Sequence, residues 1–205
     1  MPAGNYSGKQ YSYYSLAKDI VERQGQIFHK QSNQYYGFIE GYLVGIEKSD
    51  VTFKDGKEAF KIKFKLAGRN LQEIDVLECG RYTFFTRDVL NRLMSLDEIG
   101  WVKLTPYTST DDKGKNYIRG SVKHSLEFTT NIDDESCKLK FAYESKDIPE
   151  VEYVKVGKNT TADTLKRDDF FDNLIIVLNS KLKHNLDAIS RTEEEEPSEA
   201  DEIVF

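Results

Sequence analysis

A strict alternation of apolar and basic side chains marks residues 58–66 and limits most strongly what the chain can form. The apolar members are Phe60, Ile62, Phe64 and Leu66, and the basic members between them are Lys61, Lys63 and Lys65. Successive side chains of a β-strand point to opposite faces of its sheet, so this period predicts a strand. We therefore predict a sheet with one face in a core and one face outward.

Further β-type runs lie before and after this strand. Residues 35–47 contain Gly37, Gly41 and Gly45, and glycine within a strand marks a bulge or a bend. Other strands are predicted at 71–79, 101–108 and 115–124, with a short helix from Thr86 after the third strand and a turn at 111–114. The resulting element order is that of the OB-fold, a five-stranded Greek-key barrel. We therefore predict a mainly β chain with an OB-fold-like barrel over residues 35–124.

The barrel is expected to have helices and extra strands around it. Residues 1–34 are predicted to form a loose arm and then a short helix capped by Ser15, with Leu16, Ile20 and Ile27 on one side. Residues 125–191 are predicted to hold strands at 125–132, 138–144 and 151–156, then a long amphipathic helix at 168–189. The apolar stripe of this helix is Phe171, Leu174, Ile175, Leu178, Leu182, Leu186 and Ile189. It can pack on the barrel or on a second copy of the chain, so the pattern allows a homo-oligomer.

The segment 192–205 (TEEEEPSEADEIVF) is predicted to be a disordered acidic tail. It holds seven carboxylates and no basic residue, and then ends on Ile203, Val204 and Phe205. Like charges repel, so such a run does not order itself. The whole chain carries 29 basic and 35 acidic side chains, so the body without the tail is close to neutral. A tail for solubility alone has no need of an apolar end, which indicates a tethered peptide ligand for a partner's basic pocket or for a basic groove of the chain itself.

Two predicted strands combine an aliphatic face with an aromatic and basic face. In 101–108 the second face holds Trp101, Lys103 and Tyr107, and in 115–124 it holds Tyr117, Arg119 and Lys123. Single-stranded nucleic acid requires cations for its phosphates and rings for its bases, with ~1–3 kcal/mol for each stacked base. The lysines of 58–66, about 7 Å apart along their strand, suit a phosphate backbone, although solvated lysines on an outer face give the same pattern. If Ile39 and Leu43 are core residues, Tyr36, Phe38 and Tyr42 join the outer surface. The candidate DNA-binding residues are Lys61, Lys63, Lys65, Trp101, Lys103, Tyr107, Tyr117, Arg119, Lys123, Tyr36, Phe38 and Tyr42.

The sequence carries no recognised catalytic or metal-binding signature. His29, His124 and His184 lie far apart, and no phosphate-binding Gly-Lys-Ser/Thr motif or nucleophile elbow occurs. Cys79 and Cys137 lack metal-ligand spacing and are expected to be reduced thiols. No run approaches the ~18 apolar residues of a membrane span, and no signal peptide is recognisable at the start. We expect a non-enzymatic cytoplasmic protein without a metal or cofactor.

The acidic stretch 193–196, then Glu199, Asp201, Glu202 and the closing Ile203-Val204-Phe205, resembles the tail of single-stranded DNA-binding proteins of bacteria and bacteriophages. The resemblance implies an OB-fold that binds the strand and a tail that recruits replication and repair proteins. It implies partner binding by Asp201, Glu202, Ile203, Val204 and Phe205, with Phe205 in a partner pocket. Bacteriophage members also use the tail to compete for their own DNA groove. Val204 stands where the bacterial tail has proline, and the long Gly/Gln-rich linker is missing, which favours a bacteriophage-type member in the cytoplasm of a bacterium or an infected host.

These features lead to one main hypothesis and two alternatives. The main hypothesis is a protein that coats single-stranded DNA during replication, recombination or repair, with little sequence preference. The alternatives are a protein-interaction adaptor whose barrel binds protein and a single-stranded RNA-binding protein.

Overall fold

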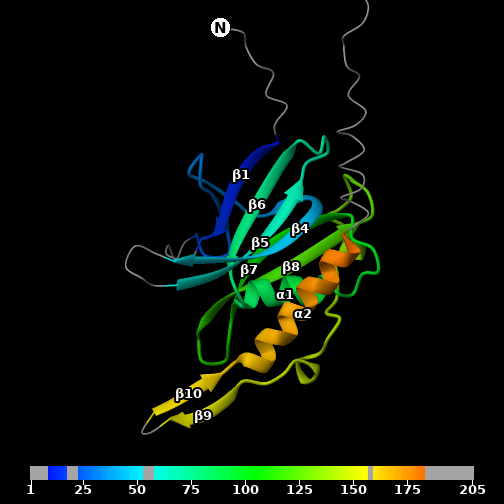
Figure 1. Ribbon diagram of the computed structural model, residues 1–205. Coiled ribbons are helices and arrows are strands. Elements are labelled where there is room, and N and C mark those ends of the chain that lie inside the picture. Colours follow the sequence, from blue (N-terminus) through cyan, green and yellow to red (C-terminus); the bar gives the residue numbers. More distant parts are fainter. Residues whose placement is uncertain (1–8, 18–22, 53–57, 157–158, 183–205) are drawn as a thin grey trace, which may run out of the picture.

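Eight strands form one curled, mixed sheet in the computed structural model, which describes residues 9–17, 23–52, 58–156 and 159–182 (Figure 1). The strands are β1 (Gln10–Leu16), β2 (Ile27–His29), β3 (Gln34–Tyr36), β4 (Ile39–Thr52), β5 (Glu58–Ala67), β6 (Glu73–Gly80), β7 (Trp101–Thr110) and β8 (Asn116–Ser125). Their order across the sheet is β3-β2-β1-β6-β5-β4-β7-β8. The β1–β6 pair is parallel, and the other neighbouring pairs are antiparallel.

A Greek key lies at the centre of this sheet. Strands β4, β5 and β6 follow one another as antiparallel neighbours, and β7 returns to lie beside β4. The spatial order β7-β4-β5-β6 is the Greek-key arrangement. The prediction of a mainly β chain with flanking helices is therefore confirmed. The five-stranded barrel is not what forms, because three N-terminal strands extend the sheet and β3 and β8 stand at its open ends.

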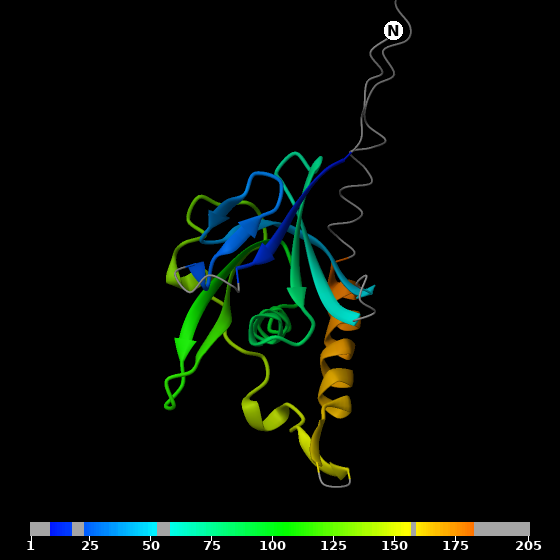
Figure 2. The ribbon, with the colours of Figure 1, turned by 90° about the vertical axis from the view of Figure 1, so that its left-hand side faces the viewer.

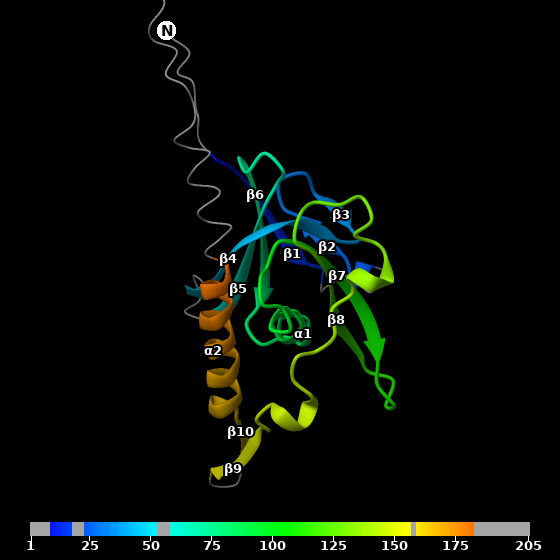
Figure 3. The same ribbon diagram turned by 90° about the vertical axis from the view of Figure 1, so that its right-hand side faces the viewer.

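Two helices cover the inner face of the curled sheet and close the main core. They are α1 (Phe84–Leu93) and α2 (Leu165–Lys181), and Figures 2 and 3 show the sheet curling around α1 with α2 along one side. Phe60, near the start of β5, is 47% exposed, contrary to the prediction, but the other apolar side chains predicted to face the core, Ile62, Phe64 and Leu66, are fully buried there. Each such side chain stabilises the fold by about 1.5–3 kcal/mol relative to exposure. The alternation in β5 thus sets which face the helices cover.

Both helices begin earlier than predicted. Thr83 caps α1, with its hydroxyl accepting a hydrogen bond from the Thr86 amide at 3.3 Å, and Thr86 itself is buried within the first turn. The predicted stripe of α2 is confirmed by the burial of Phe171, Leu174, Ile175, Leu178 and Leu182. Residues 183–189 lie outside the described residues. Within the described part of the chain, neither helix is long and apolar enough to cross a membrane.

The N-terminal helix prediction is wrong where the structure describes this segment, and Ile20 lies outside the described residues. Ser15 and Leu16 lie in β1 and Ile27 lies in β2, where Leu16 and Ile27 are paired across the two strands and both are buried. Their sequence spacing resembled one face of a helix, but they meet through strand pairing. The predicted loose arm is also partly a strand, because β1 begins at Gln10 and pairs in parallel with β6.

Three further expectations about strands need correction. The run predicted at 35–47 is divided between β3 and β4, with Gly37 and Phe38 between them. Residues 126–132 and 138–144 form no strand, and only a single bridge joins Lys138 to Lys123. Short 3-10 helices at Glu135–Cys137 and Ser145–Asp147 lie in this region. The strand predicted at 151–156 is confirmed as β9 (Glu152–Val156), which pairs with β10 (Asn159–Asp163) in a separate ribbon that projects from the body (Figure 1).

Candidate nucleic-acid interface

The face of the sheet turned away from the helices, here called the outer face, carries most of the predicted binding residues. Residues paired across neighbouring strands share a face, and Lys63 is opposite Glu78, Lys103 is opposite Lys123, and Tyr13 is opposite Val76. Ile39 and Leu43 are buried in the main core. This was the condition under which Tyr42 was predicted to lie on the outer surface. The outer-face residues used below are Tyr11, Tyr13, Phe38, Tyr42, Lys61, Lys63, Lys65, Glu78, Trp101, Lys103, Tyr107 and Lys123.

The lysines of β5 are close to carboxylates from the strands on either side. The Nζ atoms of Lys61 and Lys63 lie 3.6 and 3.7 Å from the carboxylate of Glu78, which also pairs with Lys30. Lys65 pairs with Glu47 at 2.5 Å. Burial raises the pKa of Glu78, but the hydrogen bond and charge of Lys30 and the charges of Lys61 and Lys63 outweigh it, so this pKa is lowered. The lysine row is therefore partly neutralised rather than free.

A cleft of about 400 Å³ lies between β7, β8 and the segment that follows them. Its walls include Phe38, Lys103, Thr105, Ser121, Lys123, Asp133, Glu135 and Lys138. The Lys103 ammonium lies 3.6 Å from the centre of the Phe38 ring and 2.7 and 2.9 Å from the two carboxylate oxygens of Asp133. The hydrogen bond from Lys103 is the main cause that lowers the pKa of Asp133. Three predicted residues, Phe38, Lys103 and Lys123, thus share one cleft.

Trp101 is buried, with only 4% of its surface exposed. Its ring is edge-on to Tyr42 at 5.1 Å and to Phe128 at 5.0 Å, and the Phe128 amide donates to the Tyr42 hydroxyl at 3.3 Å. The Arg69 guanidinium lies 3.3 Å from the centre of the Phe128 ring. The segment after β8 therefore folds back over the outer face and leaves neither Trp101 nor Tyr42 as an open stacking platform. The predicted stacking role of Trp101 does not fit this position.

Gly100 permits this cover, which makes it a site for a strong test. A Cβ atom at Gly100 would lie 2.1 Å from the Leu126 carbonyl oxygen, so Gly100→Ala must displace the covering segment. We expect a loss of about 1–3 kcal/mol in the free energy of unfolding, as for overpacking, and a red-shifted Trp101 emission as water reaches the ring. Chemical denaturation followed by tryptophan fluorescence measures both. Gly45→Ala is the control, because its Cβ would meet only the Lys65 side chain at 3.6 Å. Unchanged emission and stability in Gly100→Ala would contradict the packing described.

Arg119 and Tyr117 are engaged at the edge of the sheet. The Arg119 guanidinium donates to both carboxylate oxygens of Asp88 on α1, at 2.5 and 2.9 Å, and Asp88 also accepts from the Gly120 amide at 3.1 Å. The Tyr117 hydroxyl donates to Asp111 at 3.0 Å, and its ring is edge-on to Phe84 at 4.8 Å. Both residues therefore hold β8 to its surroundings. Tyr107 is paired with Arg119, so both start from the outer face at this edge of the sheet, but Tyr107 is exposed whereas Arg119 reaches Asp88 on α1.

The structure moves one predicted residue off the outer face and adds two that were missed. Tyr36 is paired with buried Ile27, so it lies on the inner side, near the rings of Tyr14 and His29. Because β3 ends at Tyr36 and β4 begins at Ile39, the alternation of faces is interrupted between them, and Tyr36 and Tyr42 lie on opposite faces. Tyr11 and Tyr13 of β1 are exposed on the outer face and were not predicted. Their spacing of two residues was the signal that could have found them.

No cluster of three or more metal-ligating side chains occurs among the described residues. Cys79 is buried and Cys137 half-buried, and neither takes part in a disulfide bond among the described residues. The predicted partner-binding residues Asp201 to Phe205 and His184 lie outside the part of the chain that the structure describes. Comparisons with protein-family models, with curated proteins and with solved structures found no significant match to this chain.

Proposed function

We propose that the chain binds single-stranded DNA on the outer face, as a protein of the bacteriophage single-stranded DNA-binding kind. One observation carries the proposal: the face left open by the helices combines exposed rings with lysines. Tyr11, Tyr13, Phe38 and Tyr107 are 39–45% exposed, and Lys61, Lys63 and Lys65 lie on the same face with a quarter or more of each side chain exposed. Rings for bases and cations for phosphates are what sequence-tolerant binding of a single strand needs.

The Greek key supports an OB-type architecture with added N-terminal strands. In OB-folds the second and third strands and the loop between the fourth and fifth contribute to the oligonucleotide site. Here β5 and β6 are the second and third strands of the Greek key, and β5 carries the lysine row. The hairpin between β7 and β8 corresponds to the loop between the fourth and fifth strands of an OB-fold, and it lies next to exposed Tyr107. We propose that the single-stranded DNA crosses β5, β4, β7 and β8 on the outer face and enters the cleft at Phe38.

The carboxylates on the outer face act as a built-in competitor for the lysines. Glu78 is close to Lys30, Lys61 and Lys63, and Asp133 pairs with Lys103, so phosphates must replace these contacts. Only 12% of the Glu78 side chain and 9% of the Lys103 side chain are exposed, so the phosphates must take over these contacts as the ion pairs break. We propose that the acidic tail 192–205 competes for the same lysines and presents Phe205 to partner proteins.

Glu78→Gln is expected to tighten binding of a single strand. The change removes one negative charge from among three lysines, so more phosphates can be contacted, and the slope of log affinity against log salt should steepen by up to about 1. The free energy of unfolding should fall slightly, because the variant loses the ion pairs of Glu78 with the lysines. Because the pKa of Glu78 is lowered by folding, its stabilisation is present above the ordinary glutamate pKa and is lost as the pH falls through the lowered value. The stability difference between Glu78→Gln and the unchanged chain should therefore close at low pH.

Fluorescence anisotropy with a labelled deoxythymidine oligomer measures this affinity. Glu152→Gln is the matched control, because Glu152 pairs with Lys166 at 2.5 Å on the projecting ribbon and the start of α2. Equal affinity and salt slope in both variants would contradict the assignment of the lysine row.

Titration of the full chain and of a chain ending at Arg191 tests the whole proposal. We expect salt-dependent binding of the oligomer by both, with equal or tighter binding by the shortened chain, because its competing carboxylates are gone. An adaptor would bind no oligomer at low salt, and that result would overturn the proposal. Competition with a ribose oligomer of the same sequence separates a DNA-binding protein from an RNA-binding protein.

A further inference from the structure

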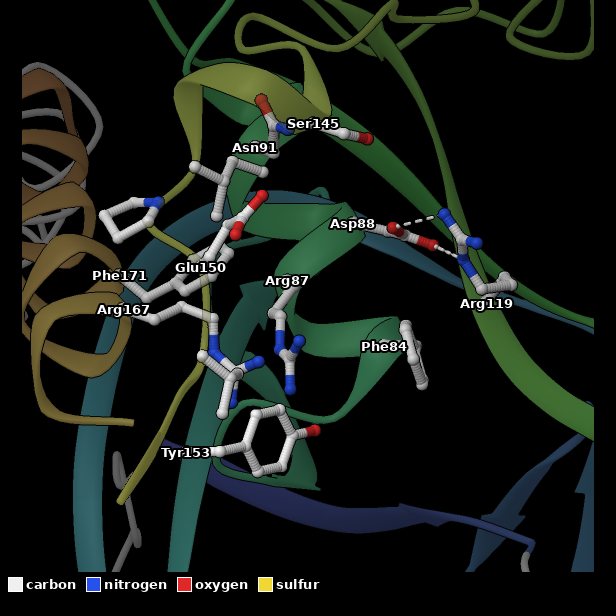
Figure 4. A pocket seen from close by; sticks show the side chains of 13 residues that line it. Phe84, Arg87, Asp88, Asn91, Arg119, Ser145, Glu150, Tyr153, Arg167 and Phe171 are labelled. Carbon is white, nitrogen blue, oxygen red and sulfur yellow. Dashed lines mark hydrogen bonds and ion pairs between the residues drawn. The ribbon is translucent and has the colours of Figure 1, made fainter. Parts of the chain in front are cut away.

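A second cavity, of about 500 Å³, lies on the helix side of the sheet, between α1, the start of α2 and the segment that leads into β9 (Figure 4). We call it the arginine pocket. It is defined by Phe84, Arg87, Arg119, Tyr153, Arg167 and Phe171. The two amide hydrogen bonds between Asn91 and the backbone of Tyr143, at 2.9 and 2.8 Å, hold the covering segment against α1. The pocket therefore has fixed walls, and it has the size of a small-molecule site.

Arg87 and Arg167 carry positive charge in this pocket without an acidic partner. Neither forms an ion pair with any residue that the structure describes, and the Nε atom of Arg167 is buried without a hydrogen-bond partner. Burial lowers the pKa of Arg87, and the charge of Arg167 lowers it further, so each guanidinium disfavours the other. Figure 4 shows both groups directed into the same space beside the ring of Tyr153.

None of the nearby carboxylates forms an ion pair with Arg87 or Arg167 among the described residues. Asp88 takes both hydrogen bonds from Arg119 and one from the Gly120 amide. One carboxylate oxygen of Asp168 accepts from the Thr164 hydroxyl at 2.6 Å, and the other is buried without a hydrogen-bond partner. The charge of Asp168 offsets only part of the repulsion at Arg87. Glu150 lines the pocket, but it is exposed and lies beyond ion-pair distance of both arginines. Two partly desolvated guanidinium groups are thus left for an anion to neutralise.

A phosphate monoester matches this arrangement better than a carboxylate does. It carries about −1.5 to −2 charges at neutral pH, close to the two uncompensated positive charges, and planar guanidinium groups bind its oxygens in pairs. The ring of Tyr153, which is 73% exposed, offers an open face for a planar group next to the phosphate, whereas the guanidinium groups of Arg87 and Arg119 lie over the ring of Phe84. We propose that the arginine pocket binds a nucleoside 5′-monophosphate unit, with Arg87 and Arg167 on the phosphate and Tyr153 against the base. This unit is either a free nucleotide or the 5′-phosphorylated end of a strand.

Calorimetric titration of the full chain with deoxythymidine 5′-monophosphate tests the proposal, with thymidine as the probe that lacks phosphate. We expect the nucleotide to bind and thymidine to bind far more weakly. Arg167→Gln should weaken nucleotide binding by about tenfold or more, since it removes a charged hydrogen-bond donor. Lys166→Gln is the control, because Lys166 is a neighbouring exposed cation outside the pocket. Arg87→Lys keeps the charge but loses the planar fork and the hydrogen bond to the Tyr82 carbonyl at 2.6 Å, so it should also weaken binding.

The outcomes separate this proposal from the one for the outer face. Phe38→Ala should leave binding of the mononucleotide unchanged, even where it weakens binding of an oligomer. Tighter binding of a 5′-phosphorylated oligomer than of its 5′-hydroxyl form identifies a strand end as the ligand, and equal binding identifies the free nucleotide. The proposal is overturned if the nucleotide does not bind at millimolar concentration, or if Arg167→Gln binds it as the unchanged chain does. It is also overturned if a peptide of residues 192–205 binds the pocket and the nucleotide does not.

Discussion

Phe38→Ala is expected to weaken binding of a single-stranded oligomer by about 1–3 kcal/mol, the range for loss of one base-stacking ring. Phe38 is exposed at the mouth of the outer-face cleft, and the Lys103 ammonium lies 3.6 Å from its ring centre. A base that stacks on the ring would thus bring its phosphate close to Lys103 and Lys123. Because the ring is exposed, the stability of the fold should change by less than about 1 kcal/mol. Anisotropy titration and thermal melting measure the two effects.

Phe141→Ala is the matched control for this prediction. Phe141 is similarly exposed, and the Arg92 guanidinium lies 3.9 Å from its ring centre, but it is on the helix side of the sheet. Phe141→Ala therefore also removes an exposed ring that contacts a cation, but on the helix side rather than on the outer face. If both variants lose affinity equally, or if neither does, the cleft is not where the strand stacks.

Asp88→Asn is expected to destabilise the fold by about 2–3 kcal/mol. The change leaves Arg119 without its charged partner and weakens the contact with the Gly120 amide, both at the junction of α1 and β8. Breaking a fully buried ion pair costs ~3–5 kcal/mol, and the smaller value applies here because 32% of the Arg119 side chain is exposed to water. Chemical denaturation measures the loss.

Glu152→Gln is the control for this second prediction, because Glu152 and its partner Lys166 are both exposed. Its effect on stability should stay within about 1 kcal/mol, the range for exposed ion pairs. A small effect of Asp88→Asn on stability with a large effect on DNA affinity would contradict the structural role given to Arg119.

The strands of the Greek key could be predicted from the sequence because their patterns are local. In β5 every second side chain is apolar, so the strand and its buried face follow directly from the alternation. For strand β1 the two-residue spacing of Tyr11 and Tyr13 was the only local signal, and its pairing could not be predicted because the parallel partner β6 lies about sixty residues later. Leu16 and Ile27 matched a helical spacing, and only the pairing of β1 with β2 shows why both are apolar.

The candidate site shows the same division between local pattern and distant contact. Alternation placed Trp101, Lys103 and Tyr107 on one face, and the register of β7 with β8 agrees. It gave no information about Phe128, which comes from an irregular segment and covers Trp101. Nor did it show that Glu78 would lie between Lys61 and Lys63, because the register of β5 with β6 depends on the whole sheet. The arginine pocket joins α1 to residues eighty positions away, so no local pattern could indicate it.

Photo-cross-linking of an oligomer that contains 5-iododeoxyuridine tests most directly whether the outer face carries the strand. The full chain is irradiated with the oligomer at low salt, and the cross-linked residues are identified by mass spectrometry. We expect cross-links at exposed outer-face rings, namely Phe38, Tyr107, Tyr11 or Tyr13, and their loss as salt is raised. Cross-links confined to Phe141, Tyr153 and other rings on the helix side, or no cross-links at all, would contradict the account.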